Sequence, residues 1–226
     1  IIVNSGFSMR RDVDIQKRLK EMAEIHSPID EMTGLPLARF IMRENGEFVE
    51  KTTRDLFFDK RVVLFGLPGA FTPTCTTSQV PDFEAAYDDL IAAGVDEVYC
   101  ISVNDAFVMN AWRESLGVEK VKFIPDGNGF FTRQLGKSVF KSNLGFGVRS
   151  WRYAAVVDSD VIEVMFSEEG QVDNCKEDPY EMSKPEKVLN YLKEVSRRED
   201  LKTEEDEDAI SVLEKFEREL FLKRHA

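Results

Sequence analysis

The chain of 226 residues has few of the side chains on which many redox and metal sites depend. It holds three cysteines, Cys75, Cys100 and Cys175, and two histidines, His26 and His225, both in the terminal regions. A small, odd number of cysteines argues against a disulfide-stapled secreted domain. The missing C-x-x-C pair excludes a thioredoxin-type dithiol and a zinc ribbon, and two distant histidines argue against a catalytic triad. We therefore expect no metal and no other cofactor.

Basic charge and long apolar runs are also scarce. The chain has 30 lysines and arginines against 42 acids, a formal net charge of −12, which argues against binding nucleic acid or an anionic membrane through bulk electrostatics. No apolar stretch approaches the roughly 20 residues that span a bilayer. The first residues show neither the apolar core of a secretory signal nor the acid-poor composition of a transit peptide. We expect a cytoplasmic protein without a nucleic-acid or membrane partner.

The length and a hydrophobic content of 42% are enough for one sizeable core with appended ends. We expect an N-terminal extension over residues 1–37, a main domain over 38–196, and an acidic linker with an amphipathic C-terminal helix over 197–226. Within this last segment apolar residues from 210 to 221 fall at helical spacing, with acids before them and basic residues after them. That charge order complements a helix dipole. The helix packs either on its own domain or on another subunit or partner.

The apolar pattern of the main domain alternates between strand and helix periods. Asn45-Gly46 between two β-capable runs predicts a hairpin. Apolar runs and stop signals then predict strands at 62–65, 97–103 and 121–124, helices at 76–93, 106–116, 130–135 and 185–195, and a late hairpin over 152–166. This order implies a parallel core with helices on both faces, to which the late hairpin adds antiparallel strands. The prediction is an α/β, thioredoxin-like fold with an N-terminal β-hairpin and an added C-terminal helix.

The most informative segment is Pro68-Gly-Ala-Phe-Thr-Pro-Thr-Cys75, between a predicted strand and a predicted helix. A cysteine at such a junction lies near unpaired backbone N–H groups and the positive end of a helix dipole, which favour the nucleophilic thiolate. The Thr72 hydroxyl can accept and donate hydrogen bonds, and Pro73 stiffens the turn. Because the segment has no basic residue before Pro81, a cation must come from elsewhere. The alternative is a small hydrophobic cysteine in a core.

The pattern Pro68-x-x-x-Thr72-x-x-Cys75 resembles the active-site pattern of the peroxiredoxins, and the fuller string is similar to the type II or type 5 branch. Similar segments follow in the same order, at Ile101–Asp105, Phe107–Trp112, Ile124–Gly127 and Gly145–Tyr153. The resemblance extends from about Ala38 to Leu192. This part of the chain is similar to the peroxidase part of bacterial peroxiredoxin-glutaredoxin hybrids. Because no C-x-x-C follows it, we expect no glutaredoxin domain.

The resemblance implies a thiol-dependent peroxidase that reduces hydrogen peroxide and small organic hydroperoxides. Cys75 would be the peroxidatic cysteine and would become a sulfenic acid. Thr72 would hydrogen-bond the thiolate and the peroxide, and Pro68 would shield the cysteine from water. Arg152 matches the active-site arginine of the family and would stabilise the charge on the leaving oxygen. Arg149 is a nearby competitor for that role, and we prefer Arg152.

How Cys75 is recycled stays open at this point. Cys100 resembles the position of the resolving thiol in plant type II enzymes, but it reads equally well as a buried strand cysteine. Cys175 lies roughly where animal type 5 enzymes carry their resolving thiol, although its neighbours match bacterial relatives better. If neither cysteine resolves the sulfenate, an external thiol must reduce it. The resemblance implies glutaredoxin with glutathione, or thioredoxin, as the reductant.

The resemblance also implies a homodimer formed through the face near the active-site loop. Phe107, Met109 and Trp112 could supply apolar surface there, or they could belong to the core. An alternative to the enzyme is a non-enzymatic redox sensor or relay that uses the same reactive Cys75. Both need a reactive thiolate, so turnover separates them: an enzyme consumes many equivalents of peroxide when a reductant is present.

Overall fold

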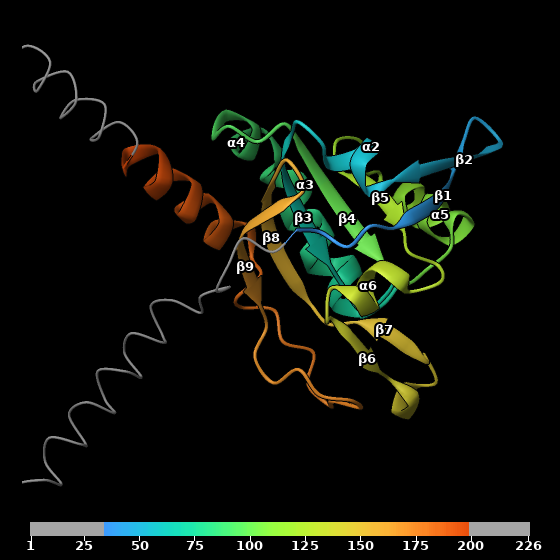
Figure 1. Ribbon diagram of the computed structural model, residues 1–226. Coiled ribbons are helices and arrows are strands. Elements are labelled where there is room, and N and C mark those ends of the chain that lie inside the picture. Colours follow the sequence, from blue (N-terminus) through green and yellow to red (C-terminus); the bar gives the residue numbers. More distant parts are fainter. Residues whose placement is uncertain (1–33, 199–226) are drawn as a thin grey trace, which may run out of the picture. The chain divides into compact units, whose positions relative to one another are not determined.

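The centre of the fold is a five-stranded mixed sheet, whose strands are labelled in Figure 1. This computed structural model describes residues 34–198. The strand order is β5-β4-β3-β8-β9, with β3 parallel to β4, β4 parallel to β5, and β8 antiparallel to both β3 and β9. The strands are β3 (Arg61–Gly66), β4 (Glu97–Ser102), β5 (Lys122–Pro125), β8 (Tyr153–Asp158) and β9 (Val161–Ser167). The predicted thioredoxin-like α/β fold is confirmed.

The hairpin predicted from Asn-Gly is present. Strands β1 (Arg39–Glu44) and β2 (Glu47–Thr52) pair antiparallel. Asn45 and Gly46 have φ values of +50° and +86°. A tight hairpin turn needs positive φ at both central residues, which asparagine and glycine tolerate best. The turn chemistry therefore fixes the register of this hairpin.

A second small hairpin was not predicted from the sequence. Strands β6 (Ser138–Phe140) and β7 (Val148–Ser150) pair antiparallel, and the turn η2 (Ser142–Leu144) lies between them. Each strand has only three residues, which is too short for a period-two pattern to be recognised. The predicted late hairpin is confirmed as β8 and β9.

The long helix predicted after Cys75 is divided into three parts. A π-helical turn, η1 (Cys75–Gln79), leads into α3 (Val80–Ala85), and α4 (Tyr87–Ala92) follows after a break at Ala86. The Val80 N–H donates to the Cys75 carbonyl, five residues earlier. Pro81 lies in the first turn of α3, where its missing N–H leaves no bond unmade. Pro81 therefore lies just after the point where the π-helical turn gives way to an α-helix.

The other helices agree with the predicted positions, apart from one short addition. They are α2 (Thr53–Phe57), which was not predicted, α5 (Ala106–Leu116), α6 (Phe130–Gln134) and a helix over residues 185–198. Asp105 caps α5, because its carboxylate accepts from the Phe107 and Val108 amides. The predicted helix at 210–221 and residues 1–33 of the predicted extension lie outside the described residues.

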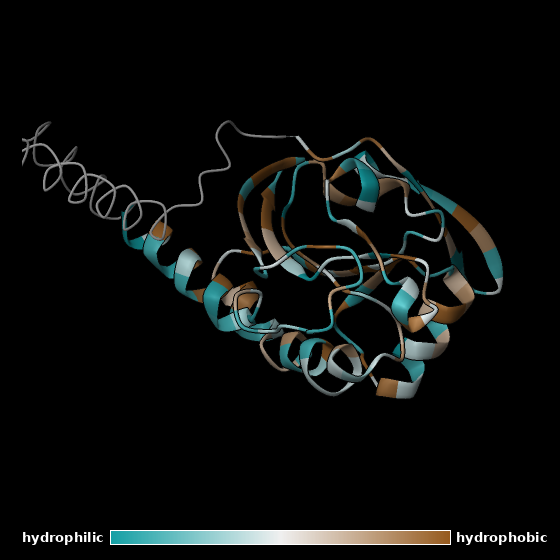
Figure 2. Ribbon diagram, turned by 90° about the horizontal axis from the view of Figure 1, so that it is seen from below, coloured by the Kyte–Doolittle hydropathy of each residue, from teal (hydrophilic) through white to brown (hydrophobic). Residues whose placement is uncertain are grey.

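Both faces of the sheet are covered. On one face a single core cluster joins the strands to the helices through Phe65, Phe83, Trp112, Val188 and Leu192. Burying Val188 and Leu192 contributes about 1.5–3 kcal/mol each to holding the 185–198 helix. On the other face, the Phe57 ring of α2 packs edge-on against Tyr99 of β4, with the ring centroids 5.5 Å apart, and β1 contacts β5. Figure 2 shows hydrophobic residues in the strands and alternating hydrophilic and hydrophobic residues along the helices, the pattern of amphipathic covering helices.

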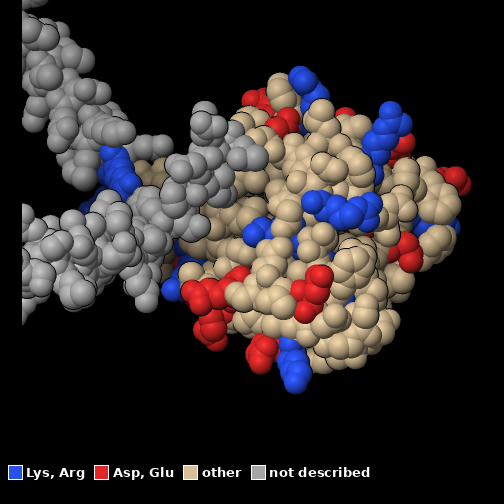
Figure 3. Space-filling view, turned by 60° about the horizontal axis from the view of Figure 1, so that its bottom comes forward, with Lys and Arg blue, Asp and Glu red and all other residues tan. Residues whose placement is uncertain are grey.

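Charged side chains of both signs are dispersed over the face shown in Figure 3, with uncharged surface between them. Among residues 34–198, no helix has the length and apolar character needed to cross a bilayer.

Candidate active site

The register of the central sheet brings two segments that are distant in sequence to one end of the sheet. Strand β3 ends at Gly66, which pairs with Tyr153, the first residue of β8. The loop that follows β3 therefore leaves the sheet beside Arg152, the residue before β8. Gly66 is required at this crossing, because a Cβ there would lie 2.2 Å from Cε1 of Tyr153. The topology thus delivers Cys75, at the end of that loop, to Arg152.

The loop over residues 67–74 is held from the neighbouring strand end. The Ala70 N–H donates to Oδ1 of Asn104 at 3.0 Å, and the Ser102 hydroxyl donates to the same oxygen at 2.8 Å. Phe71 has φ of +61°, a left-handed conformation that is rare for a bulky residue and indicates local strain. Strain of this kind persists where the surrounding contacts determine the backbone, as they do in this loop.

The two predicted loop residues, Pro68 and Thr72, lie in the loop that leads from β3 to Cys75. Pro68 is buried and Thr72 is half-buried. The Thr72 hydroxyl donates to the Gly69 carbonyl at 2.7 Å, so its oxygen lone pairs are left to accept. The Thr76 amide donates to the Thr72 carbonyl at 3.0 Å. Thr72 therefore lies in the turn that leads directly into Cys75.

Cys75 is wholly buried and faces an arginine. Its Sγ accepts a hydrogen bond from Nη1 of Arg152 at 3.4 Å. The same Nη1 donates to Oε1 of Gln79, at the other end of the π-helical turn. Wide turns of this type occur often at functional sites. Here the turn lets Cys75 and Gln79 face one guanidinium together.

The Arg152 guanidinium is 1% exposed and is hydrogen-bonded through all three of its nitrogens. Beyond Cys75 and Gln79, its Nε donates to the Pro179 carbonyl at 2.9 Å and its Nη2 pairs with the Asp178 carboxylate. Burial lowers the pKa of Arg152, but the negative charges at Cys75 and Asp178 outweigh that effect and raise it. Arg152 is thus a fixed cation, as the predicted role requires.

Arg149, the predicted competitor, lies at the same site but makes different contacts. Its Nε donates to the Phe146 carbonyl at 3.0 Å, and its Nη1 donates to Oδ1 of Asn104 at 3.4 Å. A Cβ at Gly69 would lie 2.7 Å from that Nη1, so glycine makes room for the guanidinium. Burial lowers the pKa of Arg149, against the attraction of Cys75. The preferred Arg152 is the arginine that contacts Cys75.

Cys100 lies in the middle of β4, between Phe65 of β3 and Phe123 of β5. It is wholly buried and belongs to the same core cluster as Cys75. Burial raises the pKa of the Cys100 thiol well above its ordinary value, and the charge of nearby Cys75 raises it further. A resolving cysteine attacks as a thiolate, so this environment opposes that role as long as the strand stays in place.

Cys175 is half-buried in a loop over residues 168–183. Its thiol donates to the Glu177 carboxylate at 3.4 Å, and its carbonyl accepts from Nζ of Lys141 at 3.1 Å. The amide of Asn174 donates to the Phe140 carbonyl at 2.7 Å. The loop is therefore tied to the β6–β7 hairpin around Cys175.

Three contributors to the site were not predicted from the sequence. Asn104 holds the Cys75 loop, because its Oδ1 accepts from the Ala70 N–H. Gln79 lies four residues after Cys75, a helical spacing that could have indicated a shared face. Asp178 follows Cys175 in an irregular loop, where no periodic pattern links it to Arg152.

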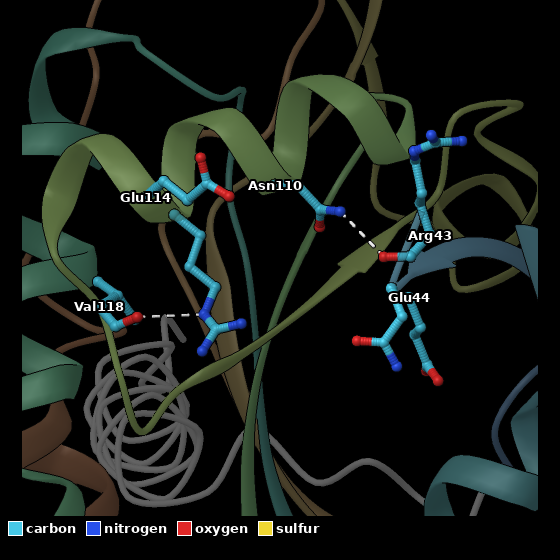
Figure 4. A pocket seen from close by; sticks show the side chains of 7 residues that line it. Arg43, Glu44, Asn110, Glu114 and Val118 are labelled. Carbon is cyan, nitrogen blue, oxygen red and sulfur yellow. Dashed lines mark hydrogen bonds between the residues drawn. The ribbon is translucent and has the colours of Figure 1, made fainter. Parts of the chain in front are cut away.

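A hollow of about 590 Å³ lies between the β1–β2 hairpin and α5. Figure 4 shows Asn110 and Glu114 of α5 opposite Arg43 and Glu44 of the hairpin, and Nδ2 of Asn110 donates to the Arg43 carbonyl at 3.0 Å. None of the four predicted catalytic residues lines this hollow. Cys75 instead is wholly buried in the core cluster.

Comparison with known proteins gives one consistent result. Residues 36–181 match the family model described as Redoxin. The peroxiredoxin y4vD of Sinorhizobium fredii is 62% identical over 143 residues, which cover 63% of this chain and 76% of that protein.

Two further similarities bear on the branch of the family and on the fold. The hybrid peroxiredoxin hyPrx5 of Haemophilus influenzae is 45% identical over 158 residues, covering 70% of this chain and 64% of that protein. The crystal structure of reduced Prx3 from Vibrio vulnificus in complex with hydrogen peroxide matches with a TM-score of 0.66 and 36% identity. That match covers 74% of this chain and 97% of that structure.

Proposed function

This chain belongs to the peroxiredoxin family, of the type II or type 5 branch, and we propose on that basis that Cys75 is its peroxidatic cysteine. Family membership makes it a thiol-dependent peroxidase. The observation that carries the assignment is the contact between Sγ of Cys75 and Nη1 of Arg152 at 3.4 Å. A buried guanidinium at that distance favours the thiolate over the thiol.

The first reaction step follows from the thiolate. Sγ of Cys75 attacks one peroxide oxygen, an S–O bond forms, and the O–O bond breaks. The sulfur is oxidised by two electrons to the sulfenic acid, and the peroxide is reduced to water or an alcohol. The leaving oxygen carries away the electron pair of the O–O bond and takes up a proton from solvent.

Arg152, Thr72 and Pro68 assist this step. The charge of Arg152 stabilises the thiolate and then the negative charge that develops on the leaving oxygen. The free lone pairs of the Thr72 hydroxyl accept a hydrogen bond from the peroxide, which orients it for attack. Pro68 brings apolar surface without an N–H group, and it limits the entry of water.

We propose hydrogen peroxide and small organic hydroperoxides as substrates. The buried position of Cys75 leaves little room for a bulky group on the peroxide. The similar Prx3 of Vibrio vulnificus was crystallised with hydrogen peroxide, which supports the smaller substrate.

Of the two candidates for the resolving thiol, we propose Cys175. It is half-buried in a loop, whereas Cys100 is wholly buried and its pKa is raised well above the ordinary value. The loop must open for Cys175 to reach Cys75. We propose that glutaredoxin with glutathione, or thioredoxin, then reduces the enzyme, and that it acts in the cytoplasm, where thiols are kept reduced. Direct reduction of the sulfenate by an external thiol is the other route.

A homodimer is the proposed assembly. Phe107 of α5 is 56% exposed and lies edge-on to the exposed Phe48 of β2, with the ring centroids 5.7 Å apart. Met109 and Trp112 are buried, so the core accounts for both. An exposed aromatic pair of this kind is typical of an interface.

The test is turnover with hydrogen peroxide and a dithiol reductant. We expect the wild type to consume many equivalents, and Cys75→Ser to consume none above background. Cys100→Ser and Cys175→Ser should both keep the first oxidation. Stoichiometric consumption by the wild type would instead indicate a redox sensor, and activity in Cys75→Ser would refute the assignment of Cys75.

A further inference from the structure

We infer that Asp178 is a positioning residue, which holds the Arg152 guanidinium in the orientation that faces Cys75. The inference rests on the proposed function of Arg152. It concerns the 168–183 loop, which meets the site through three consecutive residues, Asp178, Pro179 and Tyr180.

The loop and the π-helical turn hold opposite sides of one guanidinium. The Pro179 carbonyl and the Asp178 carboxylate accept from Nε and Nη2, respectively. Nη1 is left to Cys75 and Gln79. Because the guanidinium is planar and its five N–H donors are in a fixed geometry, fixing the Nε and Nη2 edge also fixes the direction of Nη1. The contact with the thiolate is therefore set from the far side of the arginine.

Asp178 also offsets the burial of the cation. The Arg152 side chain is 1% exposed and that of Asp178 is 42% exposed. Removing a charge from water without a partner is strongly unfavourable, and a hydrogen-bonded carboxylate compensates for part of this loss. The Asp178 carboxylate thus pairs with the buried arginine while it remains partly exposed to solvent itself.

The segment that carries Asp178 is itself anchored through the residues that follow it, Tyr180 and Ser183. The Tyr180 ring lies over Cζ of Arg152 at 5.7 Å, and its hydroxyl donates to Oδ2 of Asp82 on α3 at 2.9 Å. Beyond it, the Glu168 carboxylate accepts from the Ser183 amide at 2.8 Å. These anchors give Asp178 a defined position, which a positioning residue needs.

The experiment measures the rate of the first oxidation alone. Pre-reduced protein is mixed with hydrogen peroxide in a stopped-flow instrument, and the second-order rate constant is taken from the fluorescence change. The variants are Asp178→Ala, Asp178→Asn, Glu177→Ala and Arg152→Gln, each with a melting temperature. Glu177→Ala is the matched control, because it removes a neighbouring carboxylate that does not contact Arg152.

We expect Asp178→Ala to lower the rate constant about ten-fold, because a misplaced reacting group loses rate steeply. Asp178→Asn should restore most of it, since the amide oxygen still accepts from Nη2. Glu177→Ala should match the wild type. The inference fails if Asp178→Ala lowers only the melting temperature, or if Asp178→Asn is as slow as Asp178→Ala. If the inference about Asp178 fails but Arg152→Gln is slow, the proposed role of Arg152 still stands. An Arg152→Gln variant as fast as the wild type would overturn the proposed roles of Arg152 and of Asp178 together.

Discussion

At the scale of single residues, the site depends on two arginines with unequal contacts. Arg152 touches Sγ of Cys75 at 3.4 Å and is buried among acceptors. Arg149 bonds to a backbone carbonyl and to Asn104, without a hydrogen bond to Cys75 in the described part of the chain. The charge of Cys75 acts to raise the pKa of both arginines. The structure thus gives direct contact to one arginine and a longer-range influence to the other.

The two arginines should therefore differ when each is neutralised. We expect Arg152→Gln to slow the reaction with peroxide by about 10²-fold, the typical effect of losing one oxyanion donor. Arg149→Gln should slow the reaction with peroxide by a smaller factor than Arg152→Gln does. The measurement is the second-order rate constant of the first oxidation in each variant. The opposite ranking would transfer the role to Arg149.

At the scale of elements, the 168–183 loop is closed at its base by Glu168. One oxygen of this buried carboxylate accepts from the amides of Glu181, Met182 and Ser183 and from the Ser183 hydroxyl, at 2.7 to 3.0 Å. Burial raises the pKa of Glu168, but these hydrogen bonds outweigh it and lower the pKa below its ordinary value. The loop is therefore held through an ionised group.

This contact predicts a pH-dependent stability. A folded-state pKa below the unfolded one gives stability that is fully present above the unfolded pKa, about 4.3 for glutamate, and lost as the pH falls through the folded pKa. Glu168→Gln should lower the free energy of unfolding by about 2 kcal/mol near neutral pH, with a smaller difference in acid. Chemical denaturation at both pH values measures it, with exposed Glu169→Gln as the control. An equal difference at both pH values would contradict the argument.

At the same scale, the sequence predicted what local chemistry determines. Asn45-Gly46 requires positive φ, so the hairpin could be located, and the strand runs predicted the mixed sheet. The π-helical turn could not be predicted, because Cys75–Gln79 has only five residues, mostly polar, and this is too short to distinguish a π-helical from an α-helical spacing. The Asp178–Arg152 pair could not be predicted either, because it joins an irregular loop to a strand end through tertiary packing.

At the scale of the whole molecule, the proposed homodimer places the exposed aromatic pair Phe48 and Phe107 in an interface. Arg43 lies over both rings, with Cζ 5.4 Å from the Phe48 centroid and 4.8 Å from that of Phe107. The pair lies on β2 and α5, and Phe107 lines a hollow together with Arg43 and Asn110. Two such aromatic surfaces would bury one another across a two-fold axis.

The dimer is tested by adding charge to that pair. We expect Phe107→Glu to weaken dimerisation at least ten-fold, since a carboxylate would be buried among aromatic rings. Phe130→Glu is the control, because Phe130 is also exposed but lies on α6. Sedimentation velocity over a concentration series gives the dissociation constants. A monomeric wild type, or a Phe107→Glu variant that dimerises like it, would exclude this interface.

The proposed function depends above all on the oxidation of Cys75 by peroxide. Intact mass measurement after one equivalent of hydrogen peroxide, on the wild type and on each cysteine-to-serine variant, tests it most directly. We expect the wild type either to gain one oxygen, for a sulfenic acid, or to lose two hydrogens, for a disulfide. Cys100→Ser and Cys175→Ser should still be oxidised, and Cys75→Ser should keep its mass. Oxidation of Cys75→Ser to the same extent as the wild type would contradict the account.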